Sequence, residues 1–206
     1  MNQIALPLDW PVADGDEDFL IGEPNRLAFE HLKRWSLWPV PVTLLVGPRK
    51  SGKSLLGRIF VRKTGGRLFD NAERHDEERL FHAWNEAQAL RRPLLLIAEQ
   101  APPGWDVSLA DLRSRITATP RIQIEQPDDA LLAQLITKLL GGRGLVVSPD
   151  VTDYLVPRIE RSYLAVQQVV DVIDRAMLSS RGKMGLPTVR RTLTEAGLIH
   201  PAKQRA

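Results

Sequence analysis

Eight consecutive residues, 47 to 54, have the types and the spacing needed to bind a phosphate group. They are Gly47, Pro48, Arg49, Lys50, Ser51, Gly52, Lys53 and Ser54, and they fit the pattern G-x-x-x-x-G-K-[ST] without a mismatch. The glycines let the backbone curl so that its N–H groups point at phosphate oxygens, and a helix beginning there adds partial positive charge. We expect Lys53 to reach the β- and γ-phosphates and the Ser54 hydroxyl to hold Mg²⁺. An ordinary glycine-rich turn between a strand and a helix is the alternative.

A carboxylate at the end of a neighbouring strand is the second requirement of a phosphate loop that works with a metal. Asp70 follows the apolar pair Leu68-Phe69 and is the best candidate for this Mg²⁺ ligand. Only one acid occupies the position, because the next residue is Asn71, although Glu73 lies close by in the sequence. The alternative for Asp70 is a turn residue that ends the strand, since Asp-Asn suits a turn.

The elements that must position these residues alternate between strand and helix. Continuous apolar or β-branched runs predict buried strands at 40–46 and 93–97, and shorter strands are expected at 67–70 and, as an edge strand, at 121–125. Helical spacing of apolar residues predicts helices at 27–35, 55–62 and 77–90. The alternation indicates an α/β fold with a mostly parallel, doubly wound sheet.

The rest of the chain is expected to be helical. One apolar helix face begins after Pro127 and ends at Gly141-Gly142, and further helices are predicted at 149–159, 163–178 and 187–196. We therefore expect a nucleotide-binding α/β core at 19–126 and a small helical lid domain at 127–206. Residues 1–18, apolar at first and then acidic, are expected to be a partner-binding peptide and a linker.

Composition excludes several classes of function. Of 206 residues 43% are hydrophobic, which supports a folded core, and the absence of cysteine excludes disulfides and zinc–thiolate sites. No stretch of about 18 apolar residues predicts a membrane span, and the N-terminus has no secretory pattern, so a cytoplasmic protein is expected. The net charge is only +3, with the basic residues scattered, so composition does not predict a DNA-binding face.

Two further segments have alternatives that the residues alone leave open. Gln3-Ile4-Ala5-Leu6-Pro7-Leu8 could insert into a partner as an extended peptide or pack on its own core. Arg113 and Arg115, near Asp111 and Ser114, could stabilise charge on a neighbour's phosphate or belong to a solvated helix. The four histidines show no metal-ligand spacing and are expected to be surface or packing residues.

Several segments together resemble one family. The chain resembles the AAA+ module of the bacterial replication initiator DnaA, and more closely the short DnaA-related regulators of the Hda/HdaA type. The segments that carry the resemblance, in this order, are residues 3–8, 19–25, 47–54, 80–85, 101–103 and 111–115.

The resemblance implies roles for particular residues. Gln3, Leu6, Pro7 and Leu8 match a motif that docks on the DNA polymerase sliding clamp, and Arg115 matches an arginine finger used against ATP bound to the initiator. It also implies ADP or ATP with Mg²⁺ as the bound nucleotide. The residues expected to contact the nucleotide are Gly47, Pro48, Gly52, Lys53, Ser54, Leu55, Phe19, Leu20, Ile21, Asn25 and Arg161.

Departures from the family pattern make self-contained ATP hydrolysis doubtful. The stretch between the phosphate loop and Asp70 is too short for the extra helix and strand of a full AAA+ module. Ala98-Glu99-Gln100 follows the third strand where a polar sensor is expected, and Leu164 occupies the position of the lid arginine, with Arg161 one turn earlier. A diphosphate, or action only on a partner, fits these departures better.

Two functions from different classes follow. The first is a negative regulator of replication initiation that binds the clamp and promotes hydrolysis of DnaA-bound ATP, without a sequence-specific DNA-binding domain and with a homo-oligomer as an open expectation. The second is an independent P-loop ATPase or small-molecule phosphotransferase that uses Lys53, Ser54 and Asp70 on its own substrate. A nucleotide-free scaffold is a third, less specific alternative.

Overall fold

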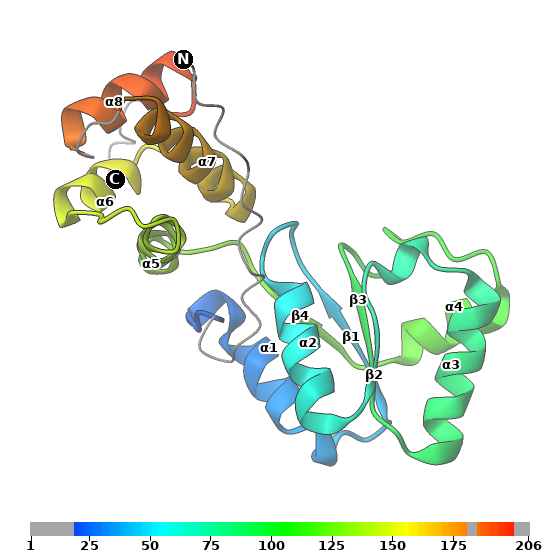
Figure 1. Cartoon of the computed structure of the whole chain (residues 1–206). Coiled ribbons are helices and arrows are strands. Elements are labelled where there is room, and N and C mark those ends of the chain that lie inside the picture. The colour runs from blue at the N-terminus through cyan, green and yellow to red at the C-terminus, as the bar shows by residue number, and fades with distance from the viewer. Residues whose placement is uncertain (1–18, 181–184, 200–206) are drawn as a thin grey trace, which may run out of the picture.

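The computed structural model describes residues 19–180 and 185–199, without the side chains of residues 179 and 180. Its sheet has four parallel strands, in the spatial order β2-β3-β1-β4 (Figure 1). They are β1 (Val42–Val46), β2 (Arg67–Phe69), β3 (Leu94–Ala98) and β4 (Arg121–Gln123). β1 and β3 are buried along their whole length, and β4 lies at an edge, as the sequence predicts.

Helices cover both faces of the sheet. On one face lie α1 (Glu23–Lys33) and α2 (Lys53–Thr64), and on the other lie α3 (Glu77–Leu90) and α4 (Ala110–Ala118) (Figure 1). The pleat divides β1 between the two layers. Val42, Leu44 and Val46 join the cluster under α3 and α4, whereas Leu45 joins the cluster under α1 and α2. Short 3₁₀ turns occupy η2 (Trp35–Leu37) and η3 (Ala72–Arg74).

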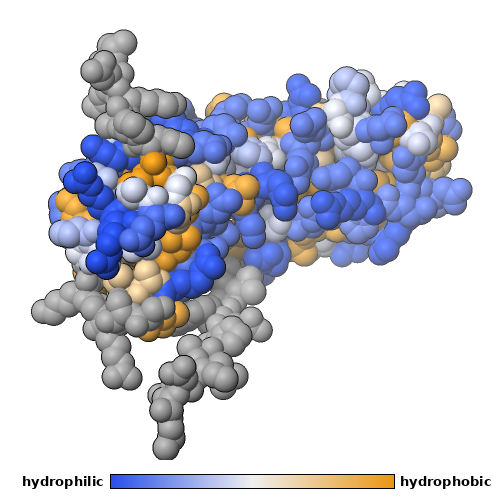
Figure 2. All heavy atoms as spheres, turned by 90° about the horizontal axis from the view of Figure 1, so that it is seen from above, coloured by the Kyte–Doolittle hydropathy of each residue, from blue (hydrophilic) through white to orange (hydrophobic). Residues whose placement is uncertain are grey.

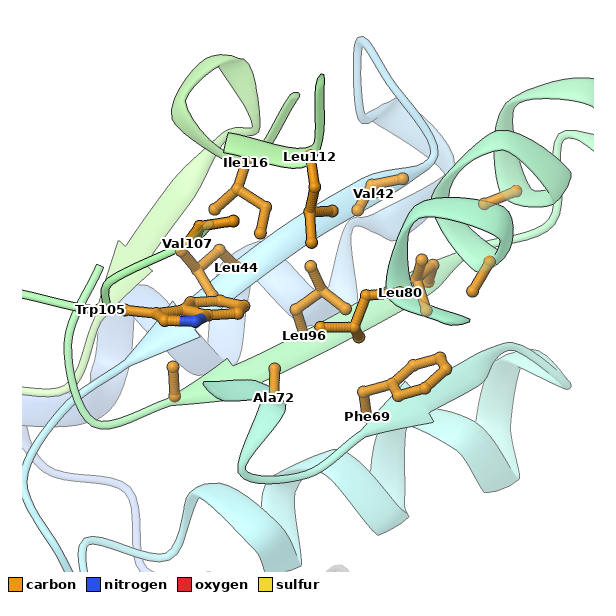
Figure 3. Close-up of a cluster of buried hydrophobic side chains, with 14 of the residues drawn as sticks. Val42, Leu44, Phe69, Ala72, Leu80, Leu96, Trp105, Val107, Leu112 and Ile116 are labelled. Carbon is orange, nitrogen blue, oxygen red and sulfur yellow. The ribbon is translucent and has the colours of Figure 1, made fainter. Parts of the chain in front are cut away.

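The layer under α3 and α4 is closed by large side chains. Leu80 from α3 and Leu112 from α4 point toward Leu96 of β3, and Trp105 from the preceding loop lies beside them (Figure 3). Each of these residues is at most 6% exposed. Burying a leucine of this kind contributes about 2 kcal/mol relative to leaving it in water. This packing fixes α4, and therefore Arg115, against the sheet.

Four helices follow the sheet. They are α5 (Asp129–Gly141), α6 (Pro149–Leu155), α7 (Tyr163–Ser180) and α8 (Leu186–Glu195), and they pack around an apolar cluster of their own. In the view from above, the described surface of the α/β part is mainly hydrophilic, and apolar side chains gather at the end formed by these helices (Figure 2). None of the described helices combines the length and apolarity needed to cross a membrane.

The sheet is one strand short of the five that the resemblance implies for a full AAA+ module. α2 ends at Thr64, and β2 begins three residues later at Arg67. Gly65 makes this tight return possible, because it ends the helix in the left-handed conformation, with φ of 65°. The short stretch before Asp70 in the sequence therefore corresponds to a direct connection from α2 to β2, with no further helix or strand between them.

Candidate nucleotide site

The phosphate loop joins the carboxyl end of β1 to the first turn of α2. Gly47 is required there because a Cβ atom would lie 2.8 Å from the carbonyl oxygen of Ile124, the residue after β4. Gly52 has φ of 87° and packs against the ring of Phe19, and Lys50 also adopts a positive φ, of 65°. These conformations curl the loop around the start of a helix, which is the arrangement that binds a phosphate anion.

Lys53 is held inside this loop. Its Nζ donates to the carbonyl oxygens of Gly47 at 2.6 Å and Pro48 at 2.7 Å, and the residue is only 8% exposed. Burial lowers the pKa of Lys53, while the carboxylates of Glu99, Glu73 and Asp70 act in the opposite direction. The lysine is therefore a buried cation aimed along its own loop and surrounded by acids from the neighbouring strand ends.

A cavity of about 350 Å³ opens beside the loop. It is lined by Arg49, Lys50, Ser51, Gly52, Lys53, Ser54, Asp70, Asn71 and Glu99. Ser54 and Asp70 therefore face one space, and a hydroxyl and a carboxylate are the oxygen ligands that Mg²⁺ prefers. The donor set fits the expected metal, and bound Mg²⁺ would supply charge neutralisation for the phosphates there.

Ser51 is a site residue that the motif alone does not identify. It is 4% exposed, and its Oγ has no hydrogen-bond partner among the described residues. A buried hydroxyl without a partner is costly, and a phosphate oxygen would provide the missing acceptor. Its position fits a loop built to hold an anion.

A second cavity, of about 230 Å³, lies between the α/β part and the helical part. It is lined by Phe19, Leu20, Asn25, Lys50, Ser51, Gly52, Leu55, Leu131, Leu135, Lys138, Leu139, Tyr163, Val166 and Gln167. Because the two cavities share residues 50–52, a phosphate chain in the first would direct the rest of a nucleotide into the second. The apolar walls suit a flat base.

Of the residues outside the phosphate loop that were expected to contact the nucleotide, four line this second cavity and two do not. Phe19, Leu20, Asn25 and Leu55 contribute to its wall. Ile21 is 46% exposed, and Arg161 forms an ion pair with Asp129 at 2.8 Å; neither is among the lining residues. A contact of either side chain with the nucleotide stays a prediction.

The side-chain amide of Asn25 is used in hydrogen bonds to the backbone of residues 20–22 and is not free to bind a ligand. Its Oδ1 accepts from the backbone N–H of Gly22 at 2.9 Å, and its Nδ2 donates to the carbonyl oxygen of Leu20 at 2.8 Å. With 2% exposure, the side chain is committed to fixing residues 20–22 at the start of α1. It therefore holds the wall of the cavity in place.

Tyr163 connects the two parts of the molecule across this cavity. It lies at the start of α7, and its hydroxyl donates to the carbonyl oxygen of Glu125, just beyond β4, at 3.0 Å. Burial, with a smaller contribution from Asp128 and Glu125, raises the pKa of Tyr163 to about 12. The hydroxyl therefore remains a donor at neutral pH.

The end of β3 carries an acid where the family pattern has a polar sensor. Glu99 pairs with Arg49 of the phosphate loop at 3.6 Å, and its backbone N–H donates to Glu73 Oε1 at 3.4 Å. Glu99 lines the phosphate-side cavity. This departure from the pattern therefore places a carboxylate, paired with Arg49, in the wall of the phosphate-side cavity.

Arg115, the expected arginine finger, lies elsewhere. It lines neither cavity and is held on the outer side of α4 by α3. Its Cζ lies 4.5 Å from the ring centroid of Phe81 and 4.9 Å from that of Trp84, and it donates a hydrogen bond to Asn85 Oδ1. The guanidinium is stacked and oriented by groups that carry no charge.

Trp84 is itself fixed by α4. Its indole N–H donates to Thr119 Oγ1 at 3.1 Å, and Thr119 Oγ1 donates to the carbonyl oxygen of Arg115 at 2.8 Å. The ring that stacks on Arg115 is thus tied to the helix that carries Arg115. The sequence motif 80–85 gave no indication of this arrangement, because its partners are about 30 residues away.

The predicted clamp-binding residues Gln3, Leu6, Pro7 and Leu8 lie outside the described residues. The residues of α5 and α7 that line the second cavity were not identified from the sequence. Their apolar spacing predicts only that one helix face is buried, and Lys138 and Gln167 carry no local signal. Only the placement of the helical part against the sheet identifies them.

Comparison with solved structures identifies the architecture. Domain III of the Thermotoga maritima replication initiation protein DnaA superimposes with a TM-score of 0.74, covering 90% of this chain and 96% of that domain. The chain has the DnaA-like AAA+ fold. AMPPCP-bound DnaA from Aquifex aeolicus matches with a TM-score of 0.61, covering 80% and 68%, and the Thermotoga maritima RuvB branch migration motor with 0.62, covering 85% and 70%. Sequence identities are 14%, 20% and 16%, so these likenesses establish the AAA+ fold alone.

Sequence comparison adds little about activity. No family model matches the chain. An uncharacterized protein of Haemophilus influenzae is 27% identical over 228 residues, with 93% of this chain and 98% of that protein covered. The chain therefore has a relative that aligns with it over nearly the full length of both.

Proposed function

We propose that this AAA+ protein is a nucleotide-binding regulator of the Hda type, which acts on a DnaA-type replication initiator. It attaches to the DNA polymerase sliding clamp through Gln3, Leu6, Pro7 and Leu8, and it presents Arg115 to ATP bound by the initiator. The nucleotide in its own site, ADP or ATP with Mg²⁺, holds the helical part on the α/β part.

The placement of Arg115 carries this proposal. Several arginines of the described residues face carboxylates, as Arg67 faces Glu86 and Arg143 faces Asp174. Arg115 is instead held by two aromatic rings and a neutral amide, away from its own phosphate loop. Its charge is therefore oriented but not neutralised, which is what a group that stabilises phosphate charge on a neighbour needs.

The acids around Lys53 support action on a partner rather than independent turnover. A phosphate-loop ATPase gains rate from groups that neutralise charge on the transferred phosphate. Here an acid, Glu99, stands in place of a polar sensor in the wall of that cavity, where it pairs with Arg49, and Asn71 replaces the second acid of the strand-end motif.

The test measures the ATPase rate of a purified DnaA-type initiator from the same source, with sliding clamp on DNA and this protein added. Wild-type protein is expected to raise this ATPase rate. The Arg115→Ala variant is expected to give a rate about 10³-fold lower than wild type gives, which is the usual effect of losing an arginine finger. Arg113→Ala is the matched control. A stimulation that survives Arg115→Ala would exclude Arg115 as the finger.

Clamp attachment is tested separately, by binding of wild type and of a Gln3→Ala, Leu6→Ala, Leu8→Ala variant to the clamp. Loss of binding only in the variant supports the proposed attachment. Wild type that does not bind the clamp contradicts it.

An independent P-loop ATPase or phosphotransferase is the second candidate, because the complete phosphate loop, Ser54 and Asp70 line one cavity. It requires steady turnover of ATP by the isolated protein, whereas the regulator does not. Turnover that falls in Lys53→Ala but persists in Arg115→Ala would favour this second function.

A further inference from the structure

An apolar groove runs between α1 and α2, on the face of the sheet opposite to Arg115. The two helices lie side by side there (Figure 1), and the space between them has a volume of about 280 Å³. Its lining residues are Phe29, Leu32, Lys33, Trp35, Leu56, Ile59, Phe60, Lys63 and Thr64. The floor belongs to the core, since Leu56, Ile59 and Phe60 are at most 4% exposed. An open apolar groove of this kind is suited to receive apolar side chains.

The rim of the groove is basic. Lys33 from α1 and Lys63 from α2 are exposed along its edge. The last turn of α2 carries two basic residues, Arg62 and Lys63, and the helix contains no acidic residue. An occupant with apolar side chains and acidic neighbours would therefore complement both the floor and the rim.

Residues 1–18 of the same chain have this composition. Apolar side chains recur at every second residue, at Ile4, Leu6, Leu8, Trp10 and Val12. The segment also contains five acidic residues, Asp9, Asp14, Asp16, Glu17 and Asp18, and no lysine, arginine or histidine. An extended peptide with this alternation presents its apolar side chains on one side.

The connection point places the segment within reach of the groove. Residue 18 joins Phe19, whose ring stacks on the groove residue Phe29 with centroids 6.3 Å apart. Leu8 precedes Phe19 by eleven positions, which span up to roughly 36 Å when extended. Along the groove α1 runs from Phe29 to its end at Lys33, a distance of about 6 Å, and Trp35 follows in η2. The tether is therefore several times longer than the site requires.

We propose that the groove between α1 and α2 binds residues 6–8 of the same chain, and that this contact withholds the segment from its partner. The side chains of Leu6 and Leu8 enter the groove, and the acidic residues that follow them lie along the basic rim. Docking of the segment does not depend on the proposed function. The withholding does rest on the proposed function, because the docked residues Leu6, Pro7 and Leu8 are also the residues proposed to bind the clamp.

Withholding has a calculable consequence for clamp binding. The apparent dissociation constant rises by the inverse of the fraction of molecules in which the segment is free. A segment docked in about nine of ten molecules weakens clamp binding about tenfold. Clamp binding and docking are then mutually exclusive, so the clamp would open the groove.

The docking test uses the indole N–H resonances of the full-length ¹⁵N-labelled protein. Trp35 lines the groove, whereas Trp84 and Trp105 lie on the other face of the sheet. Replacing Leu6→Ser with Leu8→Ser is expected to shift the Trp35 resonance and leave those of Trp84 and Trp105 unchanged. Leu90→Ser, which removes a 64% exposed apolar residue from α3, is the matched control and should not move Trp35.

The same shift is expected when the rim is changed instead of the segment. Lys33→Glu with Lys63→Glu should move Trp35 in the same direction and raise the apparent affinity for the clamp about tenfold. Arg190→Glu with Arg191→Glu makes the same charge change on α8 and should do neither.

Each outcome decides a separate point. A Trp35 resonance that neither set of variants moves overturns docking, whatever the clamp binding shows. A shift that depends on protein concentration assigns the groove to a second copy and also overturns self-docking. A concentration-independent shift without wild-type clamp binding leaves docking intact and contradicts the proposed function. Unchanged clamp affinity in the rim variant refutes the withholding.

Discussion

Two cations of this protein, Lys53 and Arg115, are held in opposite ways. Lys53 is buried in its own loop, donates to two carbonyl oxygens, and has three carboxylates nearby. Arg115 lies on the opposite helical layer between two aromatic rings, with a neutral amide as its hydrogen-bond acceptor. The first cation lies in a loop suited to phosphate, and the second has no carboxylate among the partners found for it in the described residues.

The difference lies in which groups hold each cation. Carboxylates close to Lys53 offset its charge and favour a nucleotide with fewer negative charges. Aromatic faces hold Arg115 by attraction to the ring quadrupole, so they orient it without neutralising it. The predictions below alter one side of this comparison at a time, from the largest expected effect to the smallest.

Lys53→Ala changes the first cation and should have the largest effect. It removes a charge-assisted contact to phosphate, and we expect affinity for ADP to fall about 100-fold in calorimetric titration. Lys63→Ala, at the other end of the same helix, is the control and should bind as wild type does. Equal affinities of Lys53→Ala and wild type would show that the phosphate loop no longer serves nucleotide binding.

Asn85→Asp changes the second cation without removing it. The new carboxylate would pair with Arg115 and neutralise it, so stimulation of the initiator's ATPase should fall about tenfold, or roughly 1.4 kcal/mol. Asn85→Ala loses only the orienting bond and should fall less, and ADP affinity should be unchanged in both. If Asn85→Asp stimulates the initiator's ATPase as fully as wild type while Arg115→Ala does not stimulate it, a neutral hydrogen-bond partner for Arg115 is not important.

Glu99→Gln reduces the negative charge around Lys53. We expect affinity for ATP to rise a few-fold relative to that for ADP, because a triphosphate brings the greater charge into the same cavity. Glu86→Gln, whose wild-type carboxylate pairs with Arg67 near the opposite end of the sheet, is the control. An unchanged ratio of the two affinities would show that Glu99 does not influence the choice of nucleotide.

His31 gives the smallest expected effect, which involves neither cation. Its Nε2 lies 2.8 Å from Thr43 Oγ1, which donates to the carbonyl oxygen of Pro120, so Nε2 of the ring is the donor to Thr43. Burial lowers the pKa of His31 below its usual value. The unfolded chain therefore binds the proton more readily, and stability present above pH 6.5 is lost as pH falls through the lower folded-state pKa.

The measurement is the Tm between pH 7.5 and pH 5, which should fall by a few degrees more in wild type than in His31→Gln. Glutamine retains a donor but does not titrate in this range. Identical pH dependence of the two proteins would show that His31 contributes nothing to it.

The sequence by itself determined the parts of this protein that depend on neighbours along the chain. The motif from Gly47 to Ser54 specified the loop because its chemistry is local: glycines at fixed offsets, a strand before it and a helix after it. Buried strands at β1 and β3 followed from unbroken apolar runs, and the short link before Asp70 anticipated the four-stranded sheet. Asp70 could be expected near Ser54 because the parallel order brings strand ends together at one edge.

Only the tertiary structure decided which distant residues share a site. It brought Glu99 to the phosphate-side cavity, placed Lys138 and Gln167 beside the base cavity, and enclosed Arg115 between rings from another helix. It also formed the groove between α1 and α2. Such pairings join residues about 30 or more positions apart through the packing of whole helices. Side-chain periodicity specifies which face of a helix is buried, but not what that face is buried against.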